Sequence, residues 1–249
     1  MASPETLSQK EIIERIDSSY EEVNTWDHFH RRLRGMIGSE WIFRGVSTPK
    51  HYPIPSIGRE SIYGPYKRAQ EERLFQEFKY RAVALLRAPE FNDWHWLAYA
   101  QHLGVPTRML DWTSSPLIAA FFALESDARS DRAIFCMKYS KFIHEVDGSG
   151  SSPFDCNTEG RFTPPLLFDR IRSQRGLFTI HPDPTKVFYR PGMKVIVIPH
   201  KQVGRFRKAL FKYGIDYWSV YPDAEGLGQQ MRWQFRNKVG LGSLFMDKK

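Results

Sequence analysis

A chain of 249 residues that is 41% hydrophobic and 14% aromatic can bury one sizeable core, and this composition excludes an intrinsically disordered protein. No apolar run approaches the roughly 20 residues of a membrane-spanning helix, and the first residues lack a signal-peptide pattern, so we expect a cytoplasmic protein with no membrane partner. The formal net charge of +8 attracts polyanions such as nucleic acids, although a basic surface can also serve solubility alone.

Helical periodicity dominates the first half of the chain. The helices that it predicts span residues 5–16, 26–36, 66–86, 93–102 and 117–125. Thr25 and Asp93 supply N-caps, and Pro116 stands in a first turn, where its fixed φ fits a helix. One short β run, Trp41–Phe43, stops at Arg44, and a proline-rich turn segment follows it.

The second half changes to β-type patterning. Strands are predicted at residues 133–139, 177–180 and 193–198, and a helix over residues 200–213 separates the last of these from a further β-type segment, 215–220. Residues 147–153 form a flexible loop within the domain, and Asp223 caps a final helix that ends at Asn237. These elements predict an α+β fold, with a helical segment over residues 1–36 and a single domain over residues 37–249.

Neither the two cysteines nor the eight histidines have the spacing of a metal site or a disulfide framework. Cys136 lies in an apolar run and is expected in the core, and no motif surrounds Cys156. The chain also lacks a phosphate-binding P-loop, a dinucleotide-binding Gly-x-Gly-x-x-Gly fingerprint and the Gly-x-Ser-x-Gly nucleophile motif. Two polar clusters remain as the candidate functional residues.

The first cluster is Arg44 with Gly45, directly after the β run Trp41–Phe43. An arginine at a strand end, beside a residue without a side chain, can project its planar fork into a cleft where a phosphate binds. The alternative is that Arg44 pairs with a carboxylate and only fixes a loop. The residues alone do not separate these two interpretations.

The second cluster lies at the predicted end of one helix and in the turn that follows. It contains Gln101, His102, Thr107, Arg108 and Asp111. Side chains that donate, accept and carry charge are concentrated here, and such a network must be fully hydrogen-bonded if it is buried. It is therefore either a structural lock, in which Arg108 and Asp111 pair with each other, or part of a cleft shared with Arg44.

Both clusters resemble the signatures of the FRG domain family, whose name echoes Phe43-Arg44-Gly45. The block from Ala100 to Leu124 is the most specific part of the resemblance. Residues 52–59, 170–179 and 221–227 resemble further family segments, so the resemblance covers about residues 40–235.

The Phe-Arg-Gly strand is also similar to the aromatic-Arg-Gly first strand of ADP-ribosyltransferases. That likeness implies a split sheet and NAD⁺ as substrate, with the strand arginine on a phosphate or ribose and a carboxylate near the ribose as nicotinamide leaves. FRG domains also resemble bacterial toxin and phage-defence effectors. The resemblance thus implies an ADP-ribosyltransferase that modifies a macromolecule such as RNA or DNA, with an antitoxin or chaperone as a candidate partner.

The resemblance also implies roles for individual residues. The residues expected to bind NAD⁺ are Arg44, Gly45, Gln101, Thr107, Arg108 and Gln174. Glu225, beside the small Gly226, is the first candidate for the catalytic carboxylate, Asp111 is the next, and His102 is expected to contact a ribose hydroxyl. Glu125 ends an apolar helix and is expected to face solvent.

Basic residues of the predicted helix 200–213 are expected to contact nucleic acid, namely Arg205, Arg207 and Lys208. Two other functions stay open at this point. One is a nucleic-acid-binding or nucleic-acid-cleaving module without NAD⁺ chemistry, and the other is a NAD⁺ hydrolase without an acceptor.

Overall fold

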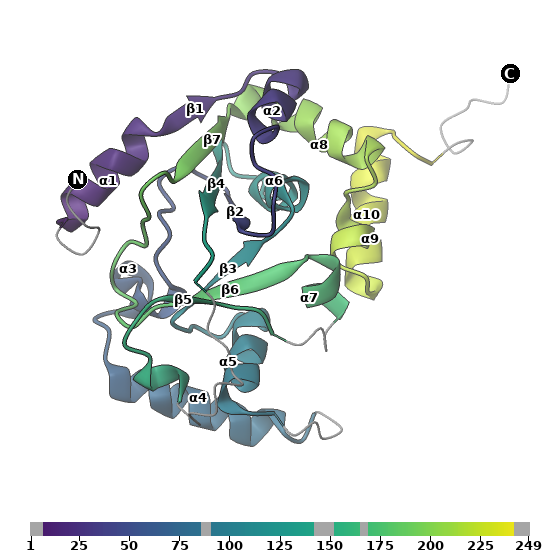
Figure 1. The fold of residues 1–249 in the computed structure, drawn as a ribbon. Coiled ribbons are helices and arrows are strands. Elements are labelled where there is room, and N and C mark those ends of the chain that lie inside the picture. Colours follow the sequence, from purple (N-terminus) through teal and green to yellow (C-terminus); the bar gives the residue numbers. More distant parts are fainter. Residues whose placement is uncertain (1–6, 86–90, 142–151, 165–168, 242–249) are drawn as a thin grey trace, which may run out of the picture.

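The computed structural model describes residues 7–85, 91–141, 152–164 and 169–241, and most of the expected loop at residues 147–153 lies outside them. Figure 1 shows the strands running through the centre of the molecule, with helices arranged around them. Among the described helices, none has the length and apolar character needed to cross a bilayer.

Within the described residues, seven strands make one sheet in the order β1-β7-β4-β2-β3-β6-β5. The strands are β1 (Tyr20–Glu22), β2 (Trp41–Val46), β3 (Met109–Thr113), β4 (Arg132–Lys138), β5 (Gly160–Phe162), β6 (Gly176–Ile180) and β7 (Lys194–Ile198). β1 and β7 are parallel, and the other neighbouring strands are antiparallel. The expected α+β fold is confirmed, and its strands are mostly antiparallel.

The sheet is weakly joined between β2 and β3. Phe43 and Thr113 form the register pair between these two strands, whereas β2 pairs with β4 along its whole length from Trp41 to Val46. Two half-sheets, β1-β7-β4-β2 and β3-β6-β5, therefore meet at this pair and separate beyond it. The structure has one sheet with a seam in place of two independent sheets.

The helices surround this sheet. They are α1 (Gln9–Ser18), α2 (Trp26–Leu33), α3 (Glu60–Tyr63), α4 (Arg68–Ala82), α5 (Asp93–His102), α6 (Pro116–Leu124), α7 (Asp169–Ser173), α8 (Val203–Lys212), α9 (Tyr217–Val220) and α10 (Ala224–Asn237). Figure 1 shows α4 and α5 together beneath the β5–β6 end and α8, α9 and α10 on the opposite flank. The seam between the half-sheets lies between these two helical groups.

Alternate residues of the strands pack on opposite faces of the sheet, as the strand period requires. Trp41 and Phe43 pack with residues of α2, α6 and α8. Ile42 lies in the cluster of the other face, with residues of α1. Helices α4 and α5 form a separate cluster with Phe178 and Ile180 of β6. The two half-sheets thus share the cluster on the α1 face, which also contains Leu110, Trp112 and Leu177, and each has a separate helical cluster on its other face.

Gly45 allows α6 to lie directly on β2. A Cβ atom at this position would stand 1.8 Å from the Ala119 carbonyl oxygen and 2.7 Å from the Ala123 amide nitrogen. Both alanines are fully buried, which explains why α6 is apolar nearly all round. This close contact brings the C-terminal end of α6 next to Arg44.

Several local expectations differ from the structure. The segment 215–220 is not extended, because Asp216 caps helix α9 through a reciprocal bond with Ser219. The N-cap of α5 is Asn92 in place of Asp93, and β3 was not predicted because its five residues do not alternate between apolar and polar. Residues before 37 are not helical throughout, since β1 extends the sheet beside β7.

Candidate functional site

A cleft of about 460 Å³ opens where β2 and β3 separate, and we call it the split cleft. Its polar lining includes Arg44, His51, Arg59, Gln101, His102, Asp111, Glu125, Arg170 and Gln174, and its aromatic lining includes Phe43, Phe122, Phe178 and Tyr221. A second pocket of about 340 Å³ adjoins it and shares Glu125, Arg170 and Tyr221. Among the residues singled out from the sequence, Arg44, Gly45, Gln101, His102, Asp111 and Gln174 meet in the split cleft.

Arg44 is a residue of β2, paired with Phe135, so the prediction that the strand stops at Arg44 is wrong: β2 continues to Val46 because it pairs with β4 along that length. Arg44 Nη1 donates a 2.7 Å hydrogen bond to the Asp111 carbonyl oxygen and lies 3.6 Å from Asp111 Oδ2. The side chain is 15% exposed, and its Nε is buried with no hydrogen-bond partner among the described residues. A buried donor left without a partner costs about 1–3 kcal/mol, so an oxyanion placed at Nε would remove an existing penalty.

Asp111 is held by a chain of hydrogen bonds. Gln101 Nε2 donates to Asp111 Oδ2 at 2.6 Å, and the Thr107 hydroxyl donates to Gln101 Oε1. The Met109 amide donates to Thr107 Oγ1 at 3.1 Å, which leaves the Thr107 proton for Gln101. The orientation of the Gln101 amide follows from these partners, and it fixes the carboxylate beside Arg44.

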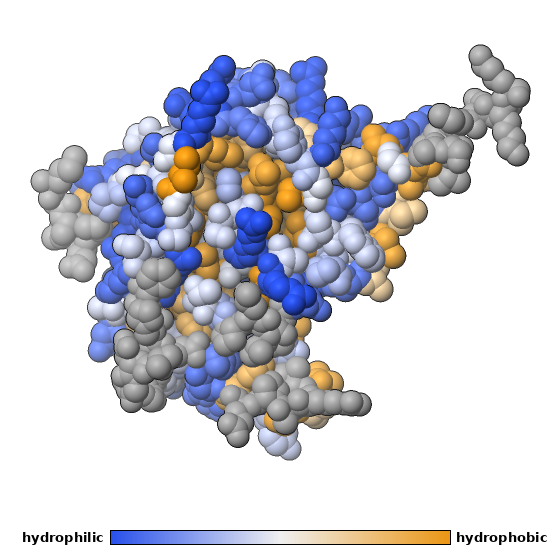
Figure 2. Space-filling view, turned by 45° about the vertical axis from the view of Figure 1, so that its right-hand side comes forward, coloured by the Kyte–Doolittle hydropathy of each residue, from blue (hydrophilic) through white to orange (hydrophobic). Residues whose placement is uncertain are grey.

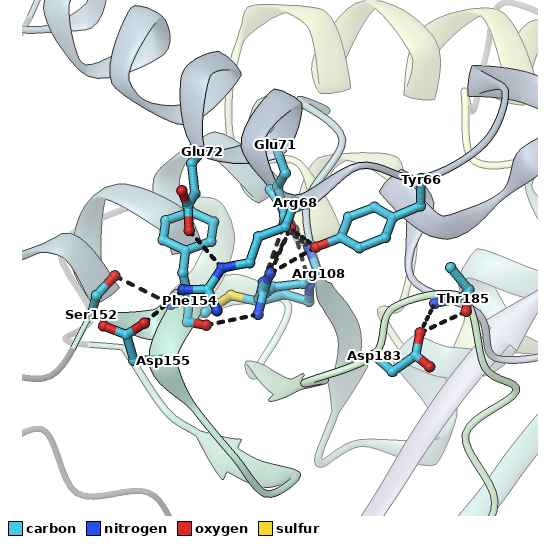
Figure 3. Close-up of polar contacts among 12 residues, drawn as sticks. Tyr66, Arg68, Glu71, Glu72, Arg108, Ser152, Phe154, Asp155, Asp183 and Thr185 are labelled. Carbon is cyan, nitrogen blue, oxygen red and sulfur yellow. Dashed lines mark hydrogen bonds and ion pairs between the residues drawn. The ribbon is translucent and has the colours of Figure 1, made fainter.

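Thr107 and Arg108 do not line the split cleft. Arg108 is 1% exposed and pairs with Glu71, also 1% exposed, at 2.7 Å (Figure 3). Its guanidinium also donates to the hydroxyl of Tyr66 and the carbonyl of Phe154. The alternative pairing of Arg108 with Asp111 is therefore wrong, because Arg108 points to α4. It joins α4 to the start of β3 and is not placed to bind a ligand in this cleft.

A cationic end of the split cleft is formed by Arg44 and Arg59. No ion pair to Arg59 occurs within the described part of the chain, although its Nε donates to the Ile54 carbonyl at 3.1 Å. Burial lowers the pKa of Arg44, and the positive charge of Arg59 lowers it further, while Asp111 opposes both effects. Burial, followed by the charges of Arg59 and Arg44, lowers the pKa of His51. His51 is thus neutral near pH 7, and the cations that remain at this end are Arg59, without an ion pair in the described chain, and Arg44, whose carboxylate neighbour is Asp111 at 3.6 Å.

The other end of the cleft is built from the segment 170–176 and the turn before α10. Arg170 Nε donates to Asp223 Oδ2 at 2.6 Å, and its guanidinium lies over the Tyr221 ring at 5.2 Å. Gln174 Nε2 donates to the Val220 carbonyl oxygen. Burial, followed by the charge of Arg170, lowers the pKa of His102, so this imidazole is neutral near pH 7.

Glu125 lines the split cleft, contrary to the expectation that it faces solvent. It follows the last residue of α6, and Tyr221 Oη donates to its Oε2 at 2.8 Å. Burial raises the pKa of this carboxyl group. The sequence could have predicted this position. A helix that is apolar on all sides is buried along its whole length, so the residue that follows its last turn is also expected to be buried.

Glu225 lies in the adjoining pocket, with 69% of its side chain exposed. Its carboxylate is 3.3 Å from Arg170 Nη2 and also accepts from Gln229. The small Gly226 does not leave room for a ligand, because a Cβ there would stand 1.9 Å from the Tyr221 carbonyl oxygen. A glycine is needed at position 226 because the chain turns tightly into α10 there.

None of the three α8 residues predicted to contact nucleic acid lines the split cleft, although Arg207 is close enough to Glu125 for its charge to lower the pKa of that carboxyl group. Arg205 and Lys208 are exposed, and Arg207 is half-buried, where it donates to the hydroxyl of Tyr217 at 2.6 Å. Arg207 also lies 5.7 Å from the Trp233 ring centroid, so it fastens α8 to α9 and α10. Along the flank formed by α9 and α10, Figure 2 shows hydrophobic residues among the hydrophilic ones.

Comparison with known proteins gives one match. Residues 39–132 match the family model of the FRG domain, and this range contains Arg44, Gln101, Asp111 and Glu125. No curated protein matches the chain, and no solved structure matches it either. Arg170, Gln174 and Tyr221 complete the split cleft from outside the matched range.

Proposed function

We propose that this chain, which contains an FRG domain at residues 39–132, binds NAD⁺ in the split cleft and transfers its ADP-ribose to a macromolecule. The observation that carries the proposal is Arg44, held at the seam of the sheet with a buried Nε donor that has no partner in the described chain. Arg59 adds a second cation, and no ion pair to it occurs in the described residues. Two such forks match a pyrophosphate, which presents oxygens to both.

The size and the lining of the cleft also suit a dinucleotide. Ligand pockets measure about 300–1,000 Å³, and the split cleft has about 460 Å³ before the adjoining pocket is added. Phe122, Phe178 and Tyr221 offer aromatic surface for a nicotinamide or adenine ring. Cationic and aromatic side chains thus line the same cleft, which supports the proposal.

The reaction would begin as the bond between ribose C1′ and nicotinamide lengthens. Nicotinamide leaves as a neutral molecule with the bonding electron pair, and positive charge develops on the ribose. The fixed Asp111 carboxylate can accept a hydrogen bond from a ribose hydroxyl and oppose that charge. Arg44 and Arg59 would hold the phosphates still, which restricts the motion to the reacting bond.

Nucleic acid is the acceptor class that we favour, because the formal net charge is +8 and the exposed Arg205 and Lys208 lie outside the cleft, where a large acceptor can reach them. Modification of cellular RNA or DNA would make this domain an effector of the toxin or phage-defence type. An antitoxin or chaperone would then be needed to restrain it in its own cell.

The test is incubation of the protein with NAD⁺ labelled in the adenylate part, separately with RNA, DNA and protein acceptors. Label transfer together with nicotinamide release supports the proposal. Release of nicotinamide with free ADP-ribose only would identify a NAD⁺ hydrolase. An absence of both, with retained nucleic-acid binding or cleavage, would overturn NAD⁺ chemistry for this domain.

A further inference from the structure

Glu125 differs from the other carboxylates near the split cleft in having no cationic partner. Asp111 lies beside Arg44 and accepts from Gln101, and Glu225 pairs with Arg170. No ion pair to Glu125 occurs among the described residues. Its carboxylate accepts a hydrogen bond from the Tyr221 hydroxyl. A carboxylate that is part-buried and not neutralised by a cation is costly to keep, which points to a use in the cleft.

The surroundings of Glu125 suit a group that meets positive charge. It sits at the C-terminal end of α6, where the last carbonyl groups carry a partial negative charge. Tyr221 holds Oε2 at 2.8 Å, and no hydrogen bond to Oε1 occurs in the described chain. The carboxylate is therefore fixed through one oxygen, while the other can serve a ligand. Glu125 also lines both the split cleft and the adjoining pocket, so it lies between the two.

From this geometry we infer that Glu125 is the catalytic base that takes the proton of the acceptor, with Tyr221 as its positioning residue. The inference rests on the proposed ADP-ribosyl transfer. The bond from ribose C1′ to the nicotinamide nitrogen breaks, and nicotinamide leaves with the electron pair. A hydroxyl or amino group of the acceptor forms the new bond to C1′, and its proton passes to Glu125.

The other two carboxylates are less suited to this step. Asp111 Oδ2 lies 3.6 Å from the Arg44 guanidinium and accepts a 2.6 Å hydrogen bond from Gln101, so this carboxylate already has its own partners. Glu225 is largely exposed in the first turn of α10 and pairs with Arg170. Glu125 alone of the three combines burial with access to both pockets.

The proposal predicts a distinctive pH profile. Burial raises the pKa of Glu125, while the Tyr221 hydrogen bond and the charge of Arg207 lower it. The polar and charged groups around it are Tyr217, Tyr221, Arg170 and Arg207. Because a base must be ionised, activity should rise with pH through the raised pKa of this carboxyl, above the usual value of about 4.3 for glutamate.

The central experiment compares the wild type with Glu125→Gln, which keeps the size of the side chain and removes its charge. Single-turnover transfer of labelled ADP-ribose should fall by about a hundredfold or more, while the Kd for NAD⁺ measured by calorimetry stays within about threefold. Glu72→Gln, an exposed glutamate of α4, is the matched control and should behave as wild type.

Tyr221→Phe tests the positioning role by its pH profile. Loss of the hydroxyl removes a hydrogen bond that lowers the pKa of Glu125, so the acidic limb of the activity profile should move to higher pH. In Glu125→Gln the same limb should be absent from the remaining activity. A purely structural role for Tyr221 would lower activity without moving this limb, and that result would overturn the pairing.

The outcomes separate the two proposals. If the wild type transfers ADP-ribose and Glu125→Gln does so within about threefold, Glu125 is not the base, although the transferase remains. If NAD⁺ affinity falls as much as the rate, Glu125 is a binding residue and the inference is overturned. If the wild type neither binds NAD⁺ nor releases nicotinamide, both the function and this role are overturned.

Discussion

Arg44 and Arg108 come from the two sequence clusters of one domain, yet their surroundings are opposite. Arg108 is buried with 1% of its side chain exposed, faces the equally buried Glu71, and donates to Tyr66 and Phe154 as well. Arg44 has one carbonyl partner, a carboxylate at 3.6 Å and a buried Nε that no described residue satisfies. The first arginine is a completed structural lock, and the second has a buried donor that the described residues leave unsatisfied.

The two arginines have the same side chain but differ in how completely their hydrogen bonds are made, so we use this completeness to assign a structural role to Arg108 and to propose a ligand-binding role for Arg44. A buried charge is tolerated when its partners satisfy it fully, and a partly satisfied one is retained for another reason. The comparison therefore predicts that substitutions of the two arginines will change different measured properties. Arg108 variants should lose stability, and Arg44 variants should lose activity.

The largest effect is expected for Arg108→Ala. Removal of one partner of a buried pair leaves Glu71 as an uncompensated charge, which costs about 3–5 kcal/mol of folding free energy. Urea denaturation followed by circular dichroism measures this loss. Arg68→Ala, which breaks exposed pairs with Glu72 and Asp155, should cost less than about 1 kcal/mol and is the control. Equal effects of the two variants would contradict the structural-lock interpretation.

Arg44→Lys should keep the fold and lose activity. Lysine retains the charge but not the planar fork, so a bidentate contact with phosphate fails. We expect the Kd for NAD⁺ to rise at least about tenfold, which is about 1.4 kcal/mol, with the denaturation midpoint nearly unchanged. Wild-type affinity in a folded Arg44→Ala protein would show that Arg44 serves the seam of the sheet and not a ligand.

Gln101→Leu sharpens the same comparison within the cleft. The change removes the hydrogen bond that orients Asp111 and the acceptor of the Thr107 hydroxyl. One lost hydrogen bond to a charged group is worth about 1.5–3 kcal/mol, so kcat/KM should fall roughly tenfold to a hundredfold. Steady-state nicotinamide release provides the measurement, and Gln70→Leu on the exposed face of α4 provides the control.

The smallest effect is expected on the surface of α8. Arg205→Glu with Lys208→Glu should weaken binding to RNA or DNA and lower the slope of log affinity against log salt by about 2, without changing the Kd for NAD⁺. Arg207 is left intact because it fastens three helices. Lys10→Glu with Lys186→Glu makes the same charge change elsewhere, and an equal slope in both variants would mean that only net charge matters.

The predicted helices of the first half agree with the structure because their signals are local. Thr25 accepts a hydrogen bond from His28 N at the start of α2, Ser115 and Pro116 begin α6, and Asp223 caps α10. The strand β3 could not be predicted in the same way. Met109–Thr113 contains the exposed Asp111 between buried residues, and its extended form depends on pairing with β6.

Local chemistry in the sequence thus determined the α+β class, most helix boundaries, and the presence of two polar clusters that include Arg44, Gln101 and Asp111. Tertiary packing decided what each cluster does, since partners distant in sequence supply the missing charges and bonds. Glu71 lies 37 residues before Arg108 and makes it structural, while Tyr221 lies 96 residues after Glu125 and places that carboxylate in the split cleft. The burial and the ion pairing of a side chain depend on residues that folding brings next to it, and the spacing of motifs along the chain does not reveal them.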